Sequence, residues 1–192
     1  INITARSKLK VPIKEKERAP VITGSRPEFY DFNLFRKEEE NENLINTTLN
    51  ELTYTVFDTE TTGLNPDRGD EIISIAAVRI VNSKIIYQDI FEELVDPKRD
   101  IPMESYKIHG ISYEMVQGQN VIETVLPAFW QFTSDTVLVG HNIAFDMKMF
   151  KVKEKAAQVK FLNPVLDTLL LSAVLHPAHE HHDLENIAKR LG

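Results

Sequence analysis

Three consecutive strand-like segments, within residues 52–95, constrain the fold of this chain more than any other feature. The first, 52–57, is rich in β-branched and aromatic residues, which is typical of a buried strand. A loop rich in Gly, Asn and Pro follows at 63–69, and two further strands are expected at 71–81 and 84–95. Because only a short turn separates the last two, we expect them to be antiparallel neighbours.

After the third strand, the hydrophobic spacing becomes mainly helical. We expect short helical turns at 105–116, a helix at 121–133 and a buried strand at 136–139. Three further helices are expected, the first from shortly after Asn142 to about Lys155, the second at 165–175 and the third at 183–191. Asp183 is a suitable N-cap for the last helix, since its carboxylate can accept hydrogen bonds from first-turn amides. Hairpin strands followed by alternating helices and strands predict an α/β domain with a mixed sheet flanked by helices.

Residues 1–51 differ from the rest and are expected to form an N-terminal extension or linker before a domain at 52–192. The stretch 6–18 is basic, and three prolines exclude a long helix. Residues 29–35 are too apolar for a purely solvated linker, so we expect them to dock on another surface. Since the chain lacks an initiator Met, we also expect it to be part of a longer protein.

Composition excludes several classes of function. The absence of cysteine removes disulfides, thiolate zinc sites and cysteine nucleophiles. No run of about 18 apolar residues is available to span a membrane, and the start lacks a signal-peptide core. The absence of cysteine fits a reducing compartment, so we expect a cytoplasmic location without a membrane segment. The net charge of −7 argues against a duplex-coating protein. It argues less against a metal-dependent nuclease, whose acidic ligands are neutralised by bound cations.

The candidate chemistry lies in three acidic residues. Asp58 and Glu60 follow the first strand at i, i+2 spacing, which places both carboxylates on one side of an extended chain. Two like charges so close favour a divalent cation between them. Asp146 falls in the first turns of a helix that follows a buried strand, where the carboxyl ends of neighbouring strands converge. The alternatives are two solvent-exposed acids and a favourable charge at a helix N-terminus.

At these positions the chain resembles the DEDD exonucleases, represented by the proofreading epsilon subunit of bacterial DNA polymerase III. The matching stretches are FDTETTGL at 57–64, IHGI at 108–111, GHN at 140–142 with Phe145 and Asp146, DTL at 167–169, and HDL at 182–184 with Ala188, Leu191 and Gly192. The resemblance covers residues 52–192. It implies a ribonuclease H-like fold and a metal-dependent 3′→5′ exonuclease. The histidine (DEDDh) type is expected, because these motifs resemble the epsilon branch more closely.

The resemblance also implies a role for each matched residue. Asp58 would bridge two Mg²⁺ or Mn²⁺ ions, Glu60 would bind the ion that holds the attacking water, and Asp146 would hold the second ion. The substrate would be single-stranded DNA or a frayed 3′ end, and a polymerase or other domains of a larger protein would be partners. The pocket for the terminal nucleotide would consist of Thr59, Thr61, Leu64 as a wedge at the last base, Ile108, His109, His141, Asn142 and Phe145.

The third motif of that family, a catalytic acid five residues after a histidine or four after a tyrosine, does not occur in this chain. The positions five residues after His176, His179, His181 and His182 are His181, Leu184, Asn186 and Ile187, none of them acidic. We therefore expect the motif after Gly192, the domain to be C-terminally incomplete, and this chain alone to cleave poorly.

Other interpretations remain open at this stage. An RNA substrate is one, and a non-catalytic nucleic-acid or protein-interaction module on the same fold is another. The histidines at 176–182 could share zinc, but a polar loop between helices is favoured. His109 and His141 could simply be buried, hydrogen-bonded histidines, and Trp130 and Phe132 are expected in the core.

Overall fold

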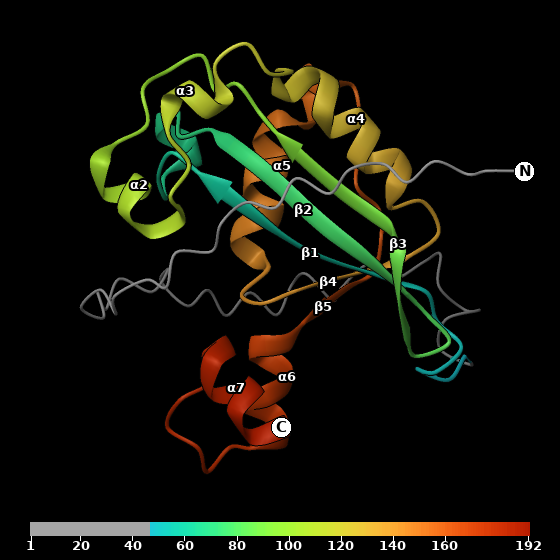
Figure 1. Cartoon of the computed structure of the whole chain (residues 1–192). Coiled ribbons are helices and arrows are strands. Elements are labelled where there is room, and N and C mark those ends of the chain that lie inside the picture. The colour runs from blue at the N-terminus through green and yellow to red at the C-terminus, as the bar shows by residue number, and fades with distance from the viewer. Residues whose placement is uncertain (1–46) are drawn as a thin grey trace, which may run out of the picture.

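A computed structural model describes residues 47–192, which fold around a five-stranded sheet (Figure 1). The strands are β1 (Tyr54–Thr61), β2 (Ile72–Val81), β3 (Lys84–Leu94), β4 (Val137–Gly140) and β5 (Val165–Asp167). They lie in the order β3-β2-β1-β4-β5. β1, β2 and β3 pair antiparallel, whereas β4 is parallel to β1 and β5 is parallel to β4. The predicted mixed sheet is confirmed.

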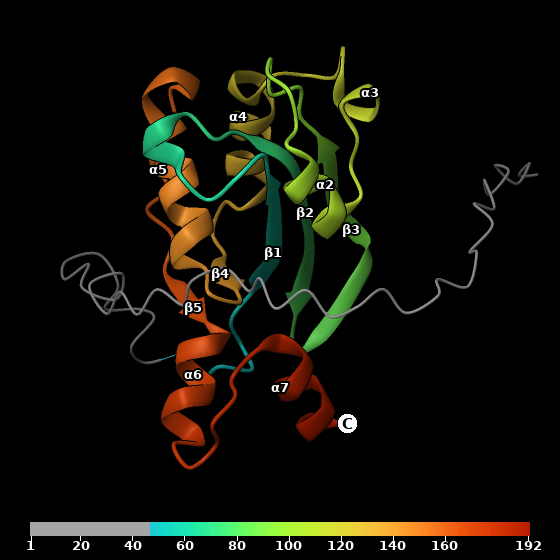
Figure 2. The ribbon, with the colours of Figure 1, turned by 90° about the vertical axis from the view of Figure 1, so that its left-hand side faces the viewer.

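Helices flank this sheet (Figure 2). They are the 3₁₀ helix η2 (Pro66–Arg68) and the α-helices α2 (Met103–His109), α3 (Tyr113–Val116), α4 (Ile122–Phe132), α5 (Ala144–Ala157), α6 (Thr168–Leu175) and α7 (Leu184–Leu191). Helices α4 and α5 cover one face of the sheet, and α6 and α7 form a helical hairpin after β5. None of the helices in residues 47–192 is both long and apolar enough to cross a membrane.

Two boundaries differ from the sequence-based expectation. The segment predicted as a helix at 165–175 begins with strand β5, because Val165 to Asp167 pair with β4, and the helix starts only at Thr168. A three-residue strand carries too little periodicity to be detected without its partner. The first strand extends beyond Phe57 to Thr61, because its ladder with β2 continues that far. Asp58 and Glu60 therefore lie inside β1 and not after it.

Local signals correctly predicted the hairpin and the last helix. Asn82 and Ser83 join β2 to β3 with φ angles of 49° and 60°, the left-handed values that a tight hairpin turn requires. Asp183 caps α7, because its Oδ1 accepts a hydrogen bond from the Asn186 amide at 3.0 Å. The predictions for residues 6–18 and 29–35 lie outside the described residues.

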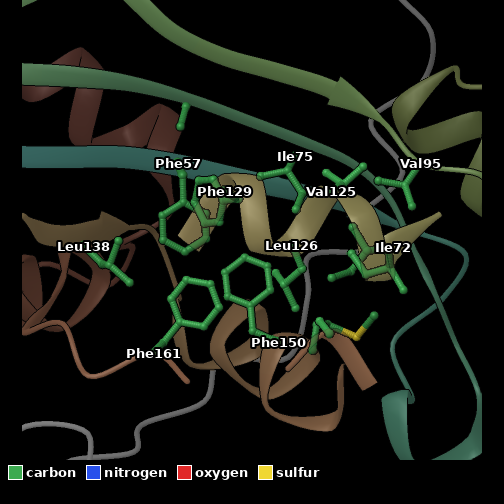
Figure 3. Close-up of a cluster of buried hydrophobic side chains, with 14 of the residues drawn as sticks. Phe57, Ile72, Ile75, Val95, Val125, Leu126, Phe129, Leu138, Phe150 and Phe161 are labelled. Atoms are coloured by element: carbon green, nitrogen blue, oxygen red, sulfur yellow. The ribbon is translucent and has the colours of Figure 1, made fainter. Parts of the chain in front are cut away.

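A cluster of phenylalanine rings fills the space between the sheet and helices α4 and α5 (Figure 3). Phe129 is completely buried, and its ring centroid lies 5.3 Å from those of Phe57 and Phe91 and 5.5 Å from that of Phe150. Phe132 packs against this cluster as predicted. The prediction for Trp130 is wrong, since this side chain is 45% exposed and its Nε1 donates to the Lys160 carbonyl. The core fixes α5 against β1, and this contact positions the candidate site.

Candidate active site

Asp58 and Glu60 lie on the same face of β1. Along this strand, Phe57, Thr59 and Thr61 are buried, whereas Asp58 is exposed and Glu60 is half-buried. The parallel ladder between β1 and β4 ends at Val56 and Val139, so both carboxylates follow the point where the two strands stop pairing. This agrees with the strand alternation inferred from the sequence, and it places both acids where α/β sheets commonly bind ligands.

Asp146 reaches β1 from the opposite face. It lies in the first turn of α5 and is only 2% exposed. Its Oδ1 accepts a short hydrogen bond from the hydroxyl of Thr59, whose side chain is on the buried face of the strand. The sequence predicted the helical position of Asp146 but not this bond, because the two residues are far apart in the chain.

Asp146 lies against β1, but Asp58, Glu60 and Asp146 are not arranged as one group of three metal ligands. Within residues 47–192, no three His, Asp or Glu side chains are placed as a group that could hold a metal ion. Asp58 and Glu60 together still offer the carboxylate oxygens that Mg²⁺ and Mn²⁺ prefer. The donor chemistry of this pair therefore fits a divalent cation.

A buried carboxylate that received no role from the sequence shapes the turn between β4 and α5. Asp167 Oδ1 accepts the amide hydrogens of Asn142 at 3.0 Å and Leu169 at 2.8 Å, and its Oδ2 accepts that of Ile143 at 3.2 Å. Asn142 adopts a left-handed φ of 57° in this turn. Gly140 is also required there, because a Cβ at this position would lie 2.9 Å from the Ile143 side chain. Asp167 thus fixes the backbone that carries His141 and Asn142.

His141 is oriented by the first residue of α6. Its Nδ1 lies 3.0 Å from the hydroxyl of Thr168, and that hydroxyl lies 3.2 Å from the Gly140 carbonyl. A carbonyl can only accept, so the single hydroxyl hydrogen of Thr168 points to Gly140 when both bonds form. His141 Nδ1 is then the donor to Thr168, which leaves Nε2 as the acceptor of the neutral ring.

His109 has the opposite tautomer. Its Nδ1 accepts the Ile111 amide hydrogen at 3.0 Å, so the neutral ring carries its proton on Nε2. That nitrogen is buried and makes no hydrogen bond of good geometry with any residue in 47–192. Burial holds the pKa of His109 below its usual value, although the nearby Thr61 backbone opposes this shift. A lowered pKa favours the neutral ring, in agreement with the acceptor role of Nδ1.

The other predicted pocket residues divide into exposed and buried groups. Leu64 is 44% exposed on the loop after β1, and Ile108 is 68% exposed on α2, so both present apolar surface to solvent. Buried residues are Thr59, Thr61, Asn142 and Phe145. Phe145 belongs to the hydrophobic core, and the Thr61 hydroxyl donates to the Gly63 carbonyl at 2.8 Å. The buried side chains of Thr59, Thr61 and Phe145 support the site from beneath.

A cleft of about 670 Å³ lies over the sheet face that carries Asp58. Its floor comes from β1 to β4, and its other walls include Thr168 and Leu169 of α6 and Leu184 of α7. Three predicted site residues line it, namely Asp58, His141 and Asn142. An acidic group and a histidine thus share a largely apolar cleft, an arrangement common in catalytic sites.

A family model described as Exonuclease matches residues 55–192, which include this cleft and all three candidate carboxylates. The chain belongs to the exonuclease family. The family that the sequence motifs indicated is thereby confirmed, and the mixed sheet flanked by helices is the ribonuclease H-like fold of such exonucleases.

Relatives of this exonuclease chain agree with that assignment. The DNA polymerase III subunit epsilon-like protein of Rhodobacter capsulatus is 44% identical over 193 residues, which cover 97% of this chain and 27% of that protein. The DNA polymerase III subunit epsilon of Rickettsia typhi is 36% identical over 140 residues, 70% of this chain and 60% of that protein. A solved structure of exonuclease X in complex with 5′ overhanging duplex DNA has a TM-score of 0.52 at 27% identity and covers 66% of each chain. The chain thus spans less than two thirds of the length of both curated relatives.

Proposed function

We propose that the full-length protein that contains this exonuclease domain removes nucleotides one at a time from 3′ ends of DNA, with two Mg²⁺ or Mn²⁺ ions held by Asp58, Glu60 and Asp146. The proposal rests on the shared face of Asp58 and Glu60 on β1, because on this face Asp58 lines the same cleft as His141 and Asn142. Membership of the exonuclease family supports the reaction class. The names of the epsilon relatives support DNA as substrate.

The three carboxylates differ in position, and we assign their roles accordingly. Asp58 and Glu60 face the cleft side of the sheet, whereas Asp146 is held against β1 by Thr59. Divalent ions bound by this set would supply Lewis acidity, which makes an attacking water more acidic and stabilises the charge on the 3′ oxygen that leaves. Asp58, the most exposed of the three and the one that lines the cleft, is the residue we expect to be indispensable.

The remaining site residues bind and orient the terminal nucleotide. Leu64 and Ile108 offer exposed apolar surface to its base, a contact that tolerates any sequence. His141 and Asn142 hold the nucleotide from the turn after β4. His109 supports the α2 side of the pocket, and the buried side chains of Thr59, Thr61 and Phe145 maintain β1 and α5 beneath it.

The test uses the full-length protein and a single-stranded DNA oligonucleotide labelled at its 5′ end. With Mg²⁺ or Mn²⁺, a ladder of products shortened from the 3′ end is expected, and a chelator should abolish it. Asp58→Ala should lose cleavage while retaining DNA binding. Glu93→Ala, which removes an exposed acid on β3, is the matched control and should cleave normally.

The same assay distinguishes the alternatives. Faster cleavage of an RNA strand of identical sequence would replace DNA by RNA as the substrate. A protein that binds DNA but is inert with or without Asp58 would contradict the enzymatic proposal in favour of a binding module.

A DNA polymerase is the proposed partner of the full-length protein, because the epsilon relatives are named as polymerase III subunits. Purification of the full-length protein from its own cells should recover a polymerase polypeptide. Recovery of the protein free of any polymerase would contradict this partner.

A further inference from the structure

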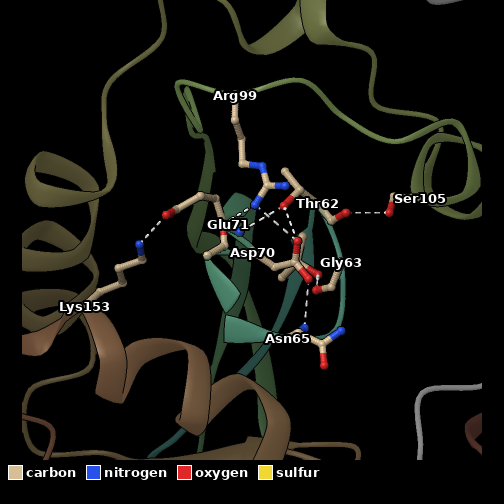
Figure 4. A network of polar contacts seen from close by, with 10 residues as sticks. Thr62, Gly63, Asn65, Asp70, Glu71, Arg99, Ser105 and Lys153 are labelled. Atoms are coloured by element: carbon tan, nitrogen blue, oxygen red, sulfur yellow. Dashed lines mark hydrogen bonds and ion pairs between the residues drawn. The ribbon is translucent and has the colours of Figure 1, made fainter. Parts of the chain in front are cut away.

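The carboxylate of Asp70 holds the loop from Thr62 to Asp70 (Figure 4). This loop carries Leu64. Its Oδ2 accepts the amide hydrogen of Asn65 at 2.9 Å, and its Oδ1 accepts the hydroxyl of Thr62 at 3.3 Å. Arg99 pairs with the same carboxylate at 3.3 Å and also donates to the Gly69 carbonyl. One charged group therefore holds both ends of this loop.

Gly63 fits closely over that carboxylate. A Cβ built at this position would lie 2.4 Å from Asp70 Oδ2 and 2.7 Å from Cγ, well inside contact distance. Asp70 thus occupies the space that a side chain at position 63 would need. The next residue, Leu64, follows this close approach and extends toward solvent with 44% of its surface exposed.

The loop is also joined to the two helices that contribute to the candidate site. The Ser105 hydroxyl on α2 donates to the Thr62 carbonyl at 2.8 Å, and α2 carries Ile108 and His109. Lys153 on α5 pairs with Glu71 at 2.5 Å in a largely buried contact. Glu71 in turn forms reciprocal bonds with Thr62, through its amide at 3.0 Å and its carbonyl at 2.8 Å. These bonds therefore connect the loop that carries Leu64 to α2 and to the helix that holds Asp146.

We propose that Asp70 is a positioning residue that holds Leu64 against the last base and thereby sets the activity on paired relative to unpaired 3′ ends. This inference rests on the proposed function. A paired end must be unstacked before it can be cleaved, whereas a single-stranded end is already open. A rigidly held apolar side chain helps to separate the terminal pair, and a mobile one does not. Loss of Asp70 should therefore slow the cleavage of paired 3′ ends more than that of single-stranded ends.

The activity test compares kcat/KM of the full-length protein on one DNA sequence, either single-stranded or with a matched terminal base pair. Asp70→Ala should lower kcat/KM on the paired end about tenfold, the size of one hydrogen bond to a charged group, and leave the single-stranded rate within about twofold. Asp70→Asn, which keeps an acceptor for Asn65 but loses the charge facing Arg99, should have a smaller selective effect. Asp100→Ala, an exposed acid beside Arg99, is the control and should leave the ratio unchanged. Equal losses on both substrates, or none, would overturn the proposal.

A thermal unfolding experiment tests the loop geometry without using activity. Gly63→Ala should lower Tm because its Cβ meets the Asp70 carboxylate. In the double variant with Asp70→Ala that space is empty, so Tm should return to the value of Asp70→Ala alone. An additive fall in the double variant would show that Gly63 and Asp70 are not coupled. Failure of the wild type to cleave any DNA would instead contradict the proposed function and leave this stability test intact.

Discussion

Thr59 donates its hydroxyl hydrogen to Asp146, a residue 87 positions later in the chain. The side chain of Thr59 is 1% exposed, so this bond forms in a buried environment at the boundary between β1 and α5. Asp58 and Glu60, the neighbours of Thr59, lie on the other face of the same strand. The strand therefore carries two acids on its cleft side, of which Asp58 lines the cleft, and it holds the third acid on its opposite face.

Replacement of Thr59 by Val should impair the reaction by removing this hydroxyl from Asp146 while preserving the shape of the side chain. Groups that orient metal ligands typically contribute about 10- to 100-fold to metal affinity or activity, and a loss of that size is expected in kcat. Thr59→Ser retains the hydroxyl and should recover most of the activity. The measurement is kcat as a function of Mg²⁺ concentration, and equal activity of the Val and Ser variants would contradict the role of this bond.

Replacement of Asp167 by Asn should destabilise the turn between β4 and α5. The amide group of Asn cannot accept all three backbone hydrogens, so a buried amide loses its partner at a cost of about 1–3 kcal/mol. Urea unfolding gives the loss of stability, and hydrogen exchange should show faster exchange at Asn142 and Ile143. Asp183→Asn is a matched control, because Asn caps a helix as well as Asp does. Slow exchange at both amides in Asp167→Asn would contradict the prediction.

Asp96 should make the folded state sensitive to acid. Hydrogen bonds from the Lys98 side chain, the Gly118 amide and the Lys98 amide lower the pKa of Asp96 to about 2. Because the folded pKa lies below the ordinary value of 3.8, this stabilisation is present above that pH and is lost as pH falls toward about 2. Urea unfolding between pH 5 and about pH 2.5 should therefore show a shallower loss for Asp96→Asn than for the wild type. Parallel curves would contradict the assignment.

Truncation of Phe129 should be the most damaging change in the core. This ring contacts four other phenylalanines, at centroid distances from 5.3 to 6.1 Å. Phe129→Ala should cost about 3–5 kcal/mol of unfolding free energy because it removes these contacts and leaves a cavity. Phe129→Leu should cost less, and Gln131→Ala on the exposed side of α4 should change stability by less than about 0.5 kcal/mol. A loss in Phe129→Ala no larger than in Gln131→Ala would contradict the importance of this cluster.

Much of the candidate site could be predicted from local patterns. Alternation along β1 placed Asp58 and Glu60 on one face, and helical spacing placed Asp146 in the first turn of α5. Both signals arise within a few residues, where backbone geometry alone determines the direction of a side chain. Local patterns did not predict how deeply each side chain is buried. Phe145 lies in the core, whereas Trp130 lies at the surface. Burial depends on which elements pack together, and hydrophobicity alone does not specify that.

The sequence by itself determined the strand that carries two acids, the helix that carries the third, the order of the motifs and therefore the family. Only the tertiary structure decided that Asp167 fixes the turn at Asn142, that Thr59 holds Asp146, and that Asp70 lies beneath Gly63. The short strand β5 likewise exists through its pairing with β4. The physical reason is the separation along the chain over which each interaction acts. Periodicity and capping act between neighbours in the chain, whereas these contacts form only when the packed core brings distant segments within hydrogen-bonding distance.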